Sequence, residues 1–278
     1  MESYTLQQKR KFFSLNLNLI LIILNILFFF IVLITSSFYA DLHKYIALTP
    51  ELIIKGEFVW TLLTSMFVHA SFPHLFFNMI SLFFLGSLVE KIIGRKRFLW
   101  FYLASGIFAG LFFALLAGFF GFGIWEKLFG NPSIAGVGAS GAIFGLVGIL
   151  AVLIPKKKVY LVGGPLIAII SQAIMETLFP GNAVVMTLGF LLNIYIFISI
   201  FAIFSFNPVM RKIALPIELS FWFVPVVAIV PLVIIGLFVN LPIGNTAHLG
   251  GFIVGLVYGF YLKNKYRNKT KYISRFFN

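Results

Sequence analysis

Long apolar runs constrain this chain more than any other feature of its sequence. A helix needs about 17–25 apolar residues to cross the hydrocarbon core of a bilayer. Runs of this length cover 17–38, 73–92, 98–120, 137–154, 184–206, 218–239 and 246–262. Only 10% of the 278 residues are charged and 61% are hydrophobic, whereas soluble domains carry about 25% charged residues. The sequence therefore predicts an all-α polytopic membrane protein.

Segment 159–179 is a further candidate span, and two interpretations of it stay open. It is long enough to cross, but two glycines, a proline, a glutamine and a glutamate interrupt it, so it could also be re-entrant or interfacial. The distribution of positive charge favours crossing. With eight spans and the N-terminus inside, every Lys and Arg lies on the inner side except Lys44, Lys55 and Lys127, as the positive-inside rule requires.

These spans divide the chain into three predicted parts. Residues 1–16 form a cytoplasmic N-terminal segment, 17–262 form the membrane domain, and 263–278 form a basic cytoplasmic tail attracted to anionic inner-leaflet lipid. The predicted location is the cell membrane, with both termini in the cytoplasm. The net charge of +13 is thereby assigned to membrane topology and not to nucleic-acid binding.

Four polar residues stand near the starts of apolar spans, where such side chains are functional candidates by default. The sequence Ser-Phe-Pro at 71–73 is typical of a helix start. It puts His74 in the first turn, with Asn78 one turn further on the same face. Ser140 and His248 open two other spans. Because all three helices run from outside to inside, we expect these side chains at one depth near the outer face.

Glycines repeat at helical spacing in the span of Ser140 and in the span of His248. They are Gly138, Gly141, Gly145 and Gly148 in the first, and Gly251, Gly255 and Gly259 in the second. Small residues at this spacing let membrane helices approach closely. If the two stripes face each other, the Ser140 hydroxyl can reach the His248 imidazole, which is the arrangement of an activated nucleophile. The only aspartate, Asp41, lies in an outer loop, so a Ser–His dyad is predicted.

A serine nucleophile also needs donors for the negative oxygen of its intermediate. The Ser140 N–H lies near a helix N-terminus, and the His74 and Asn78 side chains are donors at the same depth. Each feature also has an ordinary interpretation, as helix packing, an interhelical hydrogen bond or an interfacial residue. A metal site at His69, His74 and His248 would lack a carboxylate or thiol ligand at that depth. No metal or cofactor is therefore predicted.

These polar residues lie within three longer motifs, which read HASFPHLFFN, GASGAIFG and AHLGGFIVG. Together the motifs resemble the HxxxN, GxSG and AHxxG motifs of the rhomboid intramembrane serine proteases. The resemblance covers about 58–154 and 218–262 in the right order. It implies a six-helix core, so that 159–213 holds an inserted pair of hydrophobic helices.

The resemblance also implies a role for each matching residue. Ser140 is the implied nucleophile, His248 the general base and acid, and His74 and Asn78 the oxyanion hole. The implied supporting residues are Gly138 in the turn before the serine, Phe144 beneath the histidine, His69 in the first outer loop and Gly251 on the glycine stripe. Phe144 stands where some members have a tyrosine. Glu90 matches an acidic position at the inner end of the second helix, interpreted as an inner-end ion pair.

The predicted function is an intramembrane serine endopeptidase, whose partners are transmembrane protein substrates and the lipid bilayer. It would cleave transmembrane segments of other membrane proteins near the outer face. The alternative is a non-catalytic rhomboid-like protein that binds membrane clients, although inactive relatives lack the Ser or His that this chain has. A transporter is disfavoured, because the polar residues gather near one face and no inverted repeat is visible.

Overall fold

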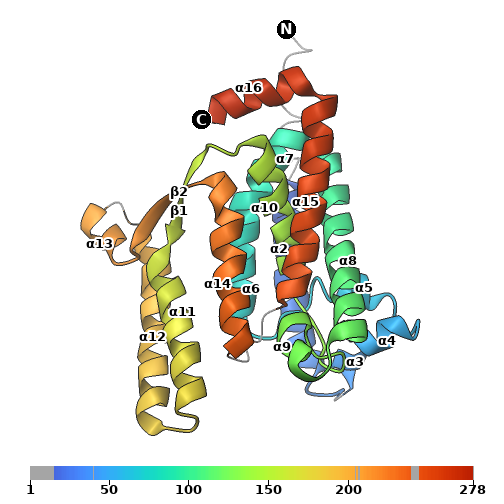
Figure 1. Cartoon of the computed structure of the whole chain (residues 1–278), viewed down its shortest axis with the longest axis vertical. Helices are drawn as coiled ribbons and strands as arrows, with labels where there is room; N and C mark the ends of the chain where they lie inside the picture. Colours follow the sequence, from blue (N-terminus) through green and yellow to red (C-terminus); the bar gives the residue numbers. More distant parts are fainter. Residues whose placement is uncertain (1–15, 40, 204, 206, 239–243, 278) are drawn as a thin grey trace.

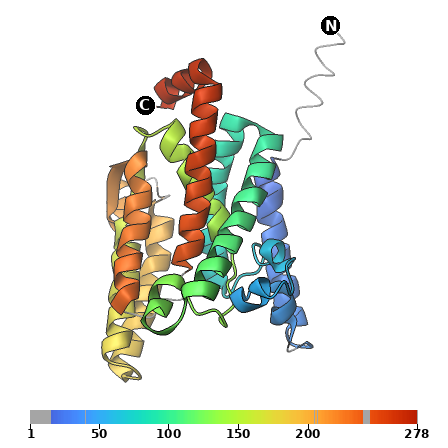
Figure 2. The same ribbon diagram turned by 45° about the vertical axis from the view of Figure 1, so that its right-hand side comes forward.

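The chain folds into a bundle of long helices that run side by side (Figures 1 and 2). The computed structural model describes residues 16–39, 41–203, 205, 207–238 and 244–277. Residues 1–15 of the predicted N-terminal segment, and positions 204, 206 and 239 of two predicted spans, lie outside this described part.

Helices make up about three quarters of the described residues. The long ones are α2 (Leu17–Thr35), α6 (Phe72–Ser81), α7 (Ser87–Ile93), α8 (Arg95–Phe120), α10 (Ser140–Leu153), α11 (Gly163–Leu178), α12 (Ala183–Ile203), α14 (Val224–Phe238), α15 (Asn245–Lys265) and α16 (Arg267–Phe277). Short helices are α3 (Leu42–Ile46), α4 (Pro50–Ile54), α5 (Thr61–Thr64), α9 (Glu126–Phe129) and α13 (Pro208–Lys212). Single turns are the π-helical η1 (Leu82–Gly86), which joins α6 to α7, and the 3₁₀ turns η2 (Gly123–Trp125) and η3 (Phe221–Phe223).

The lengths of these helices suit a membrane. Leu17–Thr35, Phe72–Ile93, Arg95–Phe120 and Ala183–Ile203 are long and apolar enough to cross one, and shorter apolar helices cover Ser140–Leu153, Gly163–Leu178 and Phe221–Leu237. Helix α15 has 21 residues but begins with the polar sequence Asn-Thr-Ala-His. The predicted all-α polytopic fold is confirmed.

Two predicted spans are wrong at their inner ends. Residues 159 and 218 were expected inside helices, but β1 (Lys158–Val162) and β2 (Pro216–Ser220) pair as an antiparallel two-stranded sheet, with Lys158 opposite Ser220. β1 lies directly before α11, which begins with Gly163 and Gly164, and β2 lies directly before the 3₁₀ turn η3. An ion pair of 3.5 Å between Lys158 and Glu218 joins the two strands. The β-branched and aromatic residues Val159, Tyr160 and Val162 favour a strand in β1, and β2 alternates apolar Ile217 and Leu219 with polar Glu218 and Ser220.

Helices α11 and α12 form an antiparallel hairpin that runs along the bundle from this sheet (Figure 1). The 16 residues of α11 rise about 24 Å at 1.5 Å per residue. Because α12 runs back antiparallel to α11, the hairpin begins and ends at the sheet end of the bundle (Figure 1).

Helix α10 is the centre of the bundle, and almost all of its residues are buried. It contacts α15 along the predicted glycine stripes, except that Gly138 precedes the helix and faces α6. A Cβ added at Gly255 would lie 2.8 Å from Gly148 Cα and 2.9 Å from Ile149 N, and one added at Gly251 would meet the Gly141 carbonyl. Since these neighbours are backbone atoms, side chains larger than hydrogen cannot be accommodated without moving the helices apart.

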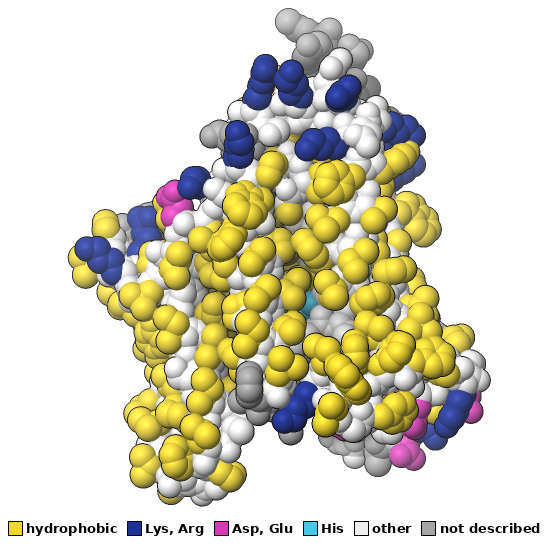
Figure 3. All heavy atoms as spheres, viewed as in Figure 1, with side chains coloured by type: hydrophobic (Ala, Val, Ile, Leu, Met, Phe, Trp, Pro, Cys, Tyr) yellow, Lys and Arg dark blue, Asp and Glu magenta, His cyan; other side chains and the backbone are white. Residues whose placement is uncertain are grey.

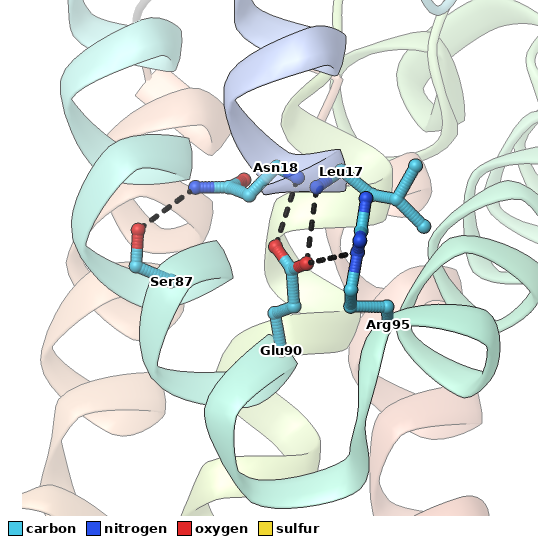
Figure 4. A network of polar contacts seen from close by, with 5 residues as sticks. All are labelled: Leu17, Asn18, Ser87, Glu90 and Arg95. Carbon is cyan, nitrogen blue, oxygen red and sulfur yellow. Dashed lines mark hydrogen bonds and ion pairs between the residues drawn. The ribbon is translucent and has the colours of Figure 1, made fainter. Parts of the chain in front are cut away.

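At the α16 end of the bundle, the buried carboxylate of Glu90 in α7 holds the start of α2 (Figure 4). Glu90 accepts hydrogen bonds from the backbone N–H groups of Leu17, at 3.0 Å, and Asn18, at 2.9 Å. Those groups open α2 and have no partner within the helix. The Arg95 Nε lies 3.7 Å from the same carboxylate. The predicted inner-end ion pair is therefore confirmed, and Glu90 additionally caps α2.

We expect Glu90→Gln to lower the free energy of unfolding by about 2 kcal/mol, because a charged acceptor facing two N–H groups is replaced by a neutral amide. Unfolding of the detergent-solubilised protein by sodium dodecyl sulfate measures the change. The control is Glu218→Gln, which removes an exposed ion pair and should cost under about 1 kcal/mol. Equal losses in the two variants would contradict the capping role.

We expect Gly255→Ala to destabilise the protein by about 1–3 kcal/mol, because the new methyl group meets backbone atoms of α10. The matched control is Gly236→Ala in α14, where the nearest atom to the new Cβ is a side-chain nitrogen of Asn245 at 3.4 Å. The same denaturant titration compares them. A Gly255→Ala protein as stable as the control would refute close packing of α10 on α15.

Candidate active site

The starts of α10 and α15 bring Ser140 and His248 into direct contact. Ser140 is the first residue of α10, and His248 lies in the first turn of α15. The His248 Nε2 lies 2.8 Å from the Ser140 Oγ, a hydrogen-bonding distance. The glycine contact between Gly141 and Gly251 lies directly below. Both side chains are half-buried, so they remain reachable from outside the bundle.

The ring of Phe144 fixes the plane of the His248 imidazole. Phe144 lies one turn after Ser140 on α10. Its ring stacks on the imidazole with centroids 4.3 Å apart and planes 16° apart. This is the position beneath the histidine that the resemblance implies. An apolar ring holds the imidazole by stacking and leaves its two nitrogens free for polar contacts.

His74 and Asn78 approach the turn that leads into Ser140 from α6. The Ser71 Oγ accepts a hydrogen bond from the His74 N–H at 3.3 Å, so the predicted helix start is confirmed. A Cβ built at Gly138 would lie 2.8 Å from His74 Nε2 and 3.6 Å from Asn78 Nδ2. Both side chains therefore face the backbone two residues before Ser140.

Asn78 carries an unused hydrogen-bond donor at this place. Its Nδ2 is buried and has no hydrogen-bond partner within the described part of the chain. Buried polar groups are nearly always paired, and an exception in a native structure calls for an explanation. A ligand oxygen that comes between Asn78 and Ser140 would supply the missing acceptor.

Glycine is the residue type that this turn tolerates most easily at position 138. Its φ of 121° lies in the region that side chains rarely adopt. Its N–H donates to the carbonyl of Ser65 at 2.9 Å, which ties the turn to the end of α5. The role of Ser65 has no signal in the sequence, because the bond uses only its backbone.

His69, for which the resemblance implies a role in supporting the first outer loop, lies against His74. Its Nδ1 is 3.3 Å from the Phe67 carbonyl, and its ring meets the His74 ring edge-on at 5.1 Å and 67°. Burial, and secondarily the neighbouring His74, lower the pKa of His69 to about 4. The ring is therefore neutral at pH 7, which adds no positive charge beside His74.

The inserted hairpin supports α6 from behind, which the sequence does not reveal. Phe76 points away from His74 and Asn78, and its ring stacks on Phe197 of α12 at 5.6 Å. Phe201 lies 6.3 Å from the same ring. Apolar residues on α12 are too uniform to show which of its faces meets α6, so this contact required the structure.

Metal ligands do not gather at this site. Within the described residues, no group of three His, Asp or Glu side chains could hold a metal ion. The arrangement instead pairs a hydroxyl with an imidazole and sets unpaired donors on the opposite side. Such an arrangement can activate a nucleophile and stabilise a negative oxygen.

The chain is similar to known proteins over a region that includes His74, Asn78 and Ser140 but ends before His248. Residues 56–199 match the family model described as the Rhomboid domain, which is more than half of the chain. A stretch of 154 residues is 36% identical to Rhomboid protease GluP of Bacillus subtilis and covers 54% of this chain and 27% of that protein. A stretch of 120 residues is 34% identical to RHOMBOID-like protein 1 of Arabidopsis thaliana, covering 43% and 27%. The chain spans less than half the length of the curated relatives it matches.

We expect Gly138→Ala to slow labelling of Ser140 by a serine-directed fluorophosphonate by about tenfold or more, because the new methyl group displaces a donor that stabilises the negative oxygen. The control is Gly123→Ala. Gly123 also has a positive φ, of 58°, but nothing lies within 4 Å of a Cβ built there. This control therefore strains the backbone without a clash, and its labelling rate should stay unchanged. Equal slowing in both variants would show that backbone strain, and not the added methyl group beside His74, slows the labelling.

Proposed function

The chain belongs to the rhomboid family, and from this premise we propose that it is a serine endopeptidase that cleaves transmembrane segments of other membrane proteins. The observation that carries the proposal is the 2.8 Å contact between the Ser140 Oγ and the His248 Nε2. This contact is formed by two helix starts inside a membrane bundle. A hydroxyl that only stabilised the fold would not need an imidazole partner stacked in place by Phe144.

In the proposed acylation step, the Ser140 Oγ attacks the carbonyl carbon of the scissile peptide bond. The His248 Nε2 accepts the hydroxyl proton as the new C–O bond forms. The carbonyl electrons move to its oxygen. When this tetrahedral intermediate collapses, the C–N bond breaks and His248 returns the proton to the leaving amine. The product is an ester on Ser140.

The negative oxygen of the intermediate would lie between α6 and the start of α10. The unpaired Asn78 Nδ2, the His74 ring and the Ser140 backbone N–H are the donors proposed for it. The first N–H groups of a helix have no partner within it and favour negative charge. Each such donor typically contributes about 10²–10³ in rate.

Water must then hydrolyse the ester, and the surroundings of the site admit it. His74, Ser140 and His248 are only half-buried. Asn245 opens α15 beside them. In the deacylation step His248 removes a proton from water, the hydroxide oxygen attacks the ester carbonyl, and the Ser140 oxygen leaves with that proton.

The position of the site indicates which part of a substrate it would cut. Helices α6, α10 and α15 all begin at the end of the bundle opposite α16 (Figure 1). Most Lys and Arg side chains visible in Figure 3 gather at the α16 end. By the positive-inside rule that end is the cytoplasmic one, so cleavage is proposed near the outer face and both termini are proposed to be cytoplasmic.

The substrate must also expose a peptide bond that a helix normally shields. We propose single-span substrates with helix-weakening residues near the cleavage site and small residues at the scissile bond. Glycine and proline destabilise a helix by about 1 and 3 kcal/mol relative to alanine. Such residues would let a transmembrane helix unwind at the level of Ser140.

Cleavage of a reconstituted single-span reporter protein tests the proposal. We expect the wild-type chain to cut the reporter near its outer end, and both Ser140→Ala and His248→Ala to lose at least about 10³ of the rate. Gly123→Ala, where nothing lies within 4 Å of the added Cβ, controls for handling of the variants. Equal cleavage by all of the proteins would overturn the proposal. Reporter binding without cleavage by the wild type would instead favour a client-binding protein.

A further inference from the structure

A second candidate site lies at the opposite end of the bundle from Ser140. A cavity of about 360 Å³ opens between the C-terminal ends of α10 and α15 and the terminal helix α16. Its apolar side is formed by Val152, Leu153 and Pro155, where α10 ends. The remaining lining comes from α15 and α16 and is polar or charged. One wall is therefore apolar and the other is basic.

The basic wall consists of four cations repeated every fourth residue. They are Lys263, Arg267, Lys271 and Arg275, and all of them line the cavity. Arg267, Lys271 and Arg275 are spaced by four and share one face of α16, whereas Lys263 lies in the last turn of α15. Because like charges on one face repel each other, an anion held between neighbouring cations would stabilise this wall.

The acidic side chains of the described residues are not paired with these four cations. Within the described part of the chain, none of the four side chains has an acidic partner. The acidic residues at this end, Glu90 and Glu218, are engaged by Arg95 and Lys158. Among the described residues, the cavity thus carries positive charge that no paired carboxylate offsets.

Helix α16 lies across one end of the helix bundle (Figure 1). It turns away from α15 at Tyr266 and runs across the end of the bundle (Figures 1 and 2). Ile273 packs against the core, which holds the helix in place. Tyr272 is 70% exposed on another face. An amphipathic helix with basic and aromatic faces is typical of one that lies in the membrane interface.

We propose that this cavity binds the phosphate headgroup of an anionic phospholipid from the leaflet at this end of the bundle. The guanidinium groups of Arg267 and Arg275 suit bidentate contacts with phosphate oxygens, and Lys263 and Lys271 add positive charge. Leu153 and Val152 are only 3% and 7% exposed, so the start of an acyl chain would contact the half-buried Pro155 on the apolar side. The place of the cavity under α16, at the end of a bundle of apolar helices (Figure 1), favours a lipid headgroup over free phosphate.

Native mass spectrometry of the delipidated full-length protein tests this site without any dependence on proteolysis. The probes are phosphatidylglycerol and phosphatidylcholine of matched acyl chains, and inorganic phosphate alone. We expect the wild type to retain one phosphatidylglycerol with about tenfold or greater preference over phosphatidylcholine. Retention of inorganic phosphate, without preference between the two lipids, would overturn the assignment to a lipid.

Two double variants of equal charge separate a built site from general attraction. Arg267→Gln with Lys271→Gln removes cations that line the cavity, and Lys265→Gln with Lys269→Gln removes cations of the same tail that do not. We expect the first pair to abolish the preference for phosphatidylglycerol and the second to keep it. Equal loss in both pairs, or no loss in the first, would overturn the site. An unchanged unfolding titration in sodium dodecyl sulfate verifies that each variant is folded.

Discussion

The contact between the backbones of α10 and α15 is the constraint on which the rest of the structure depends. Gly141 and Gly148 face Gly251 and Gly255, and no atom of a side chain separates the two helices there. Only this spacing lets a short hydroxyl on one helix reach an imidazole on the other, at 2.8 Å. The glycines that weaken each helix alone are thus what allows the Ser140–His248 pair to form.

Helix α6 completes the site opposite the Ser140–His248 pair, and other helices hold α6 in place. Helix α6 presents His74 and Asn78 on one face, and Phe76 on the opposite face packs against α12. The π-helical turn η1 continues α6 into α7, where Glu90 caps the start of α2. The inserted hairpin and the Glu90 network therefore act on the same helix from two directions. Both limit its freedom to move away from Gly138.

Much of this arrangement follows from the sequence, because it depends on periodicity and on the positions of charges. The glycine spacing, the helix start at 71–73 and the shared depth of Ser140 and His248 all required only helical geometry. The strands at 158–162 and 216–220 were missed, since short apolar segments next to spans look like their continuation. The packing of α12 on Phe76 was also out of reach, because α12 is apolar on every face and hydrophobicity does not orient it. The hydrogen bond from the Gly138 N–H to the Ser65 carbonyl joins two backbone groups, so no residue type in the sequence indicates it.

The structure of the protein after reaction with a peptidyl phosphonate would test the central claim most directly, since it images the site in its reacting geometry. The account predicts phosphorus bonded to the Ser140 Oγ, with the His248 Nε2 within hydrogen-bonding distance. It also predicts the phosphonate oxygen facing Asn78 and His74, with the glycine contact between α10 and α15 retained. A phosphonate bonded to another residue, or an oxygen turned away from Asn78 and His74, would contradict it.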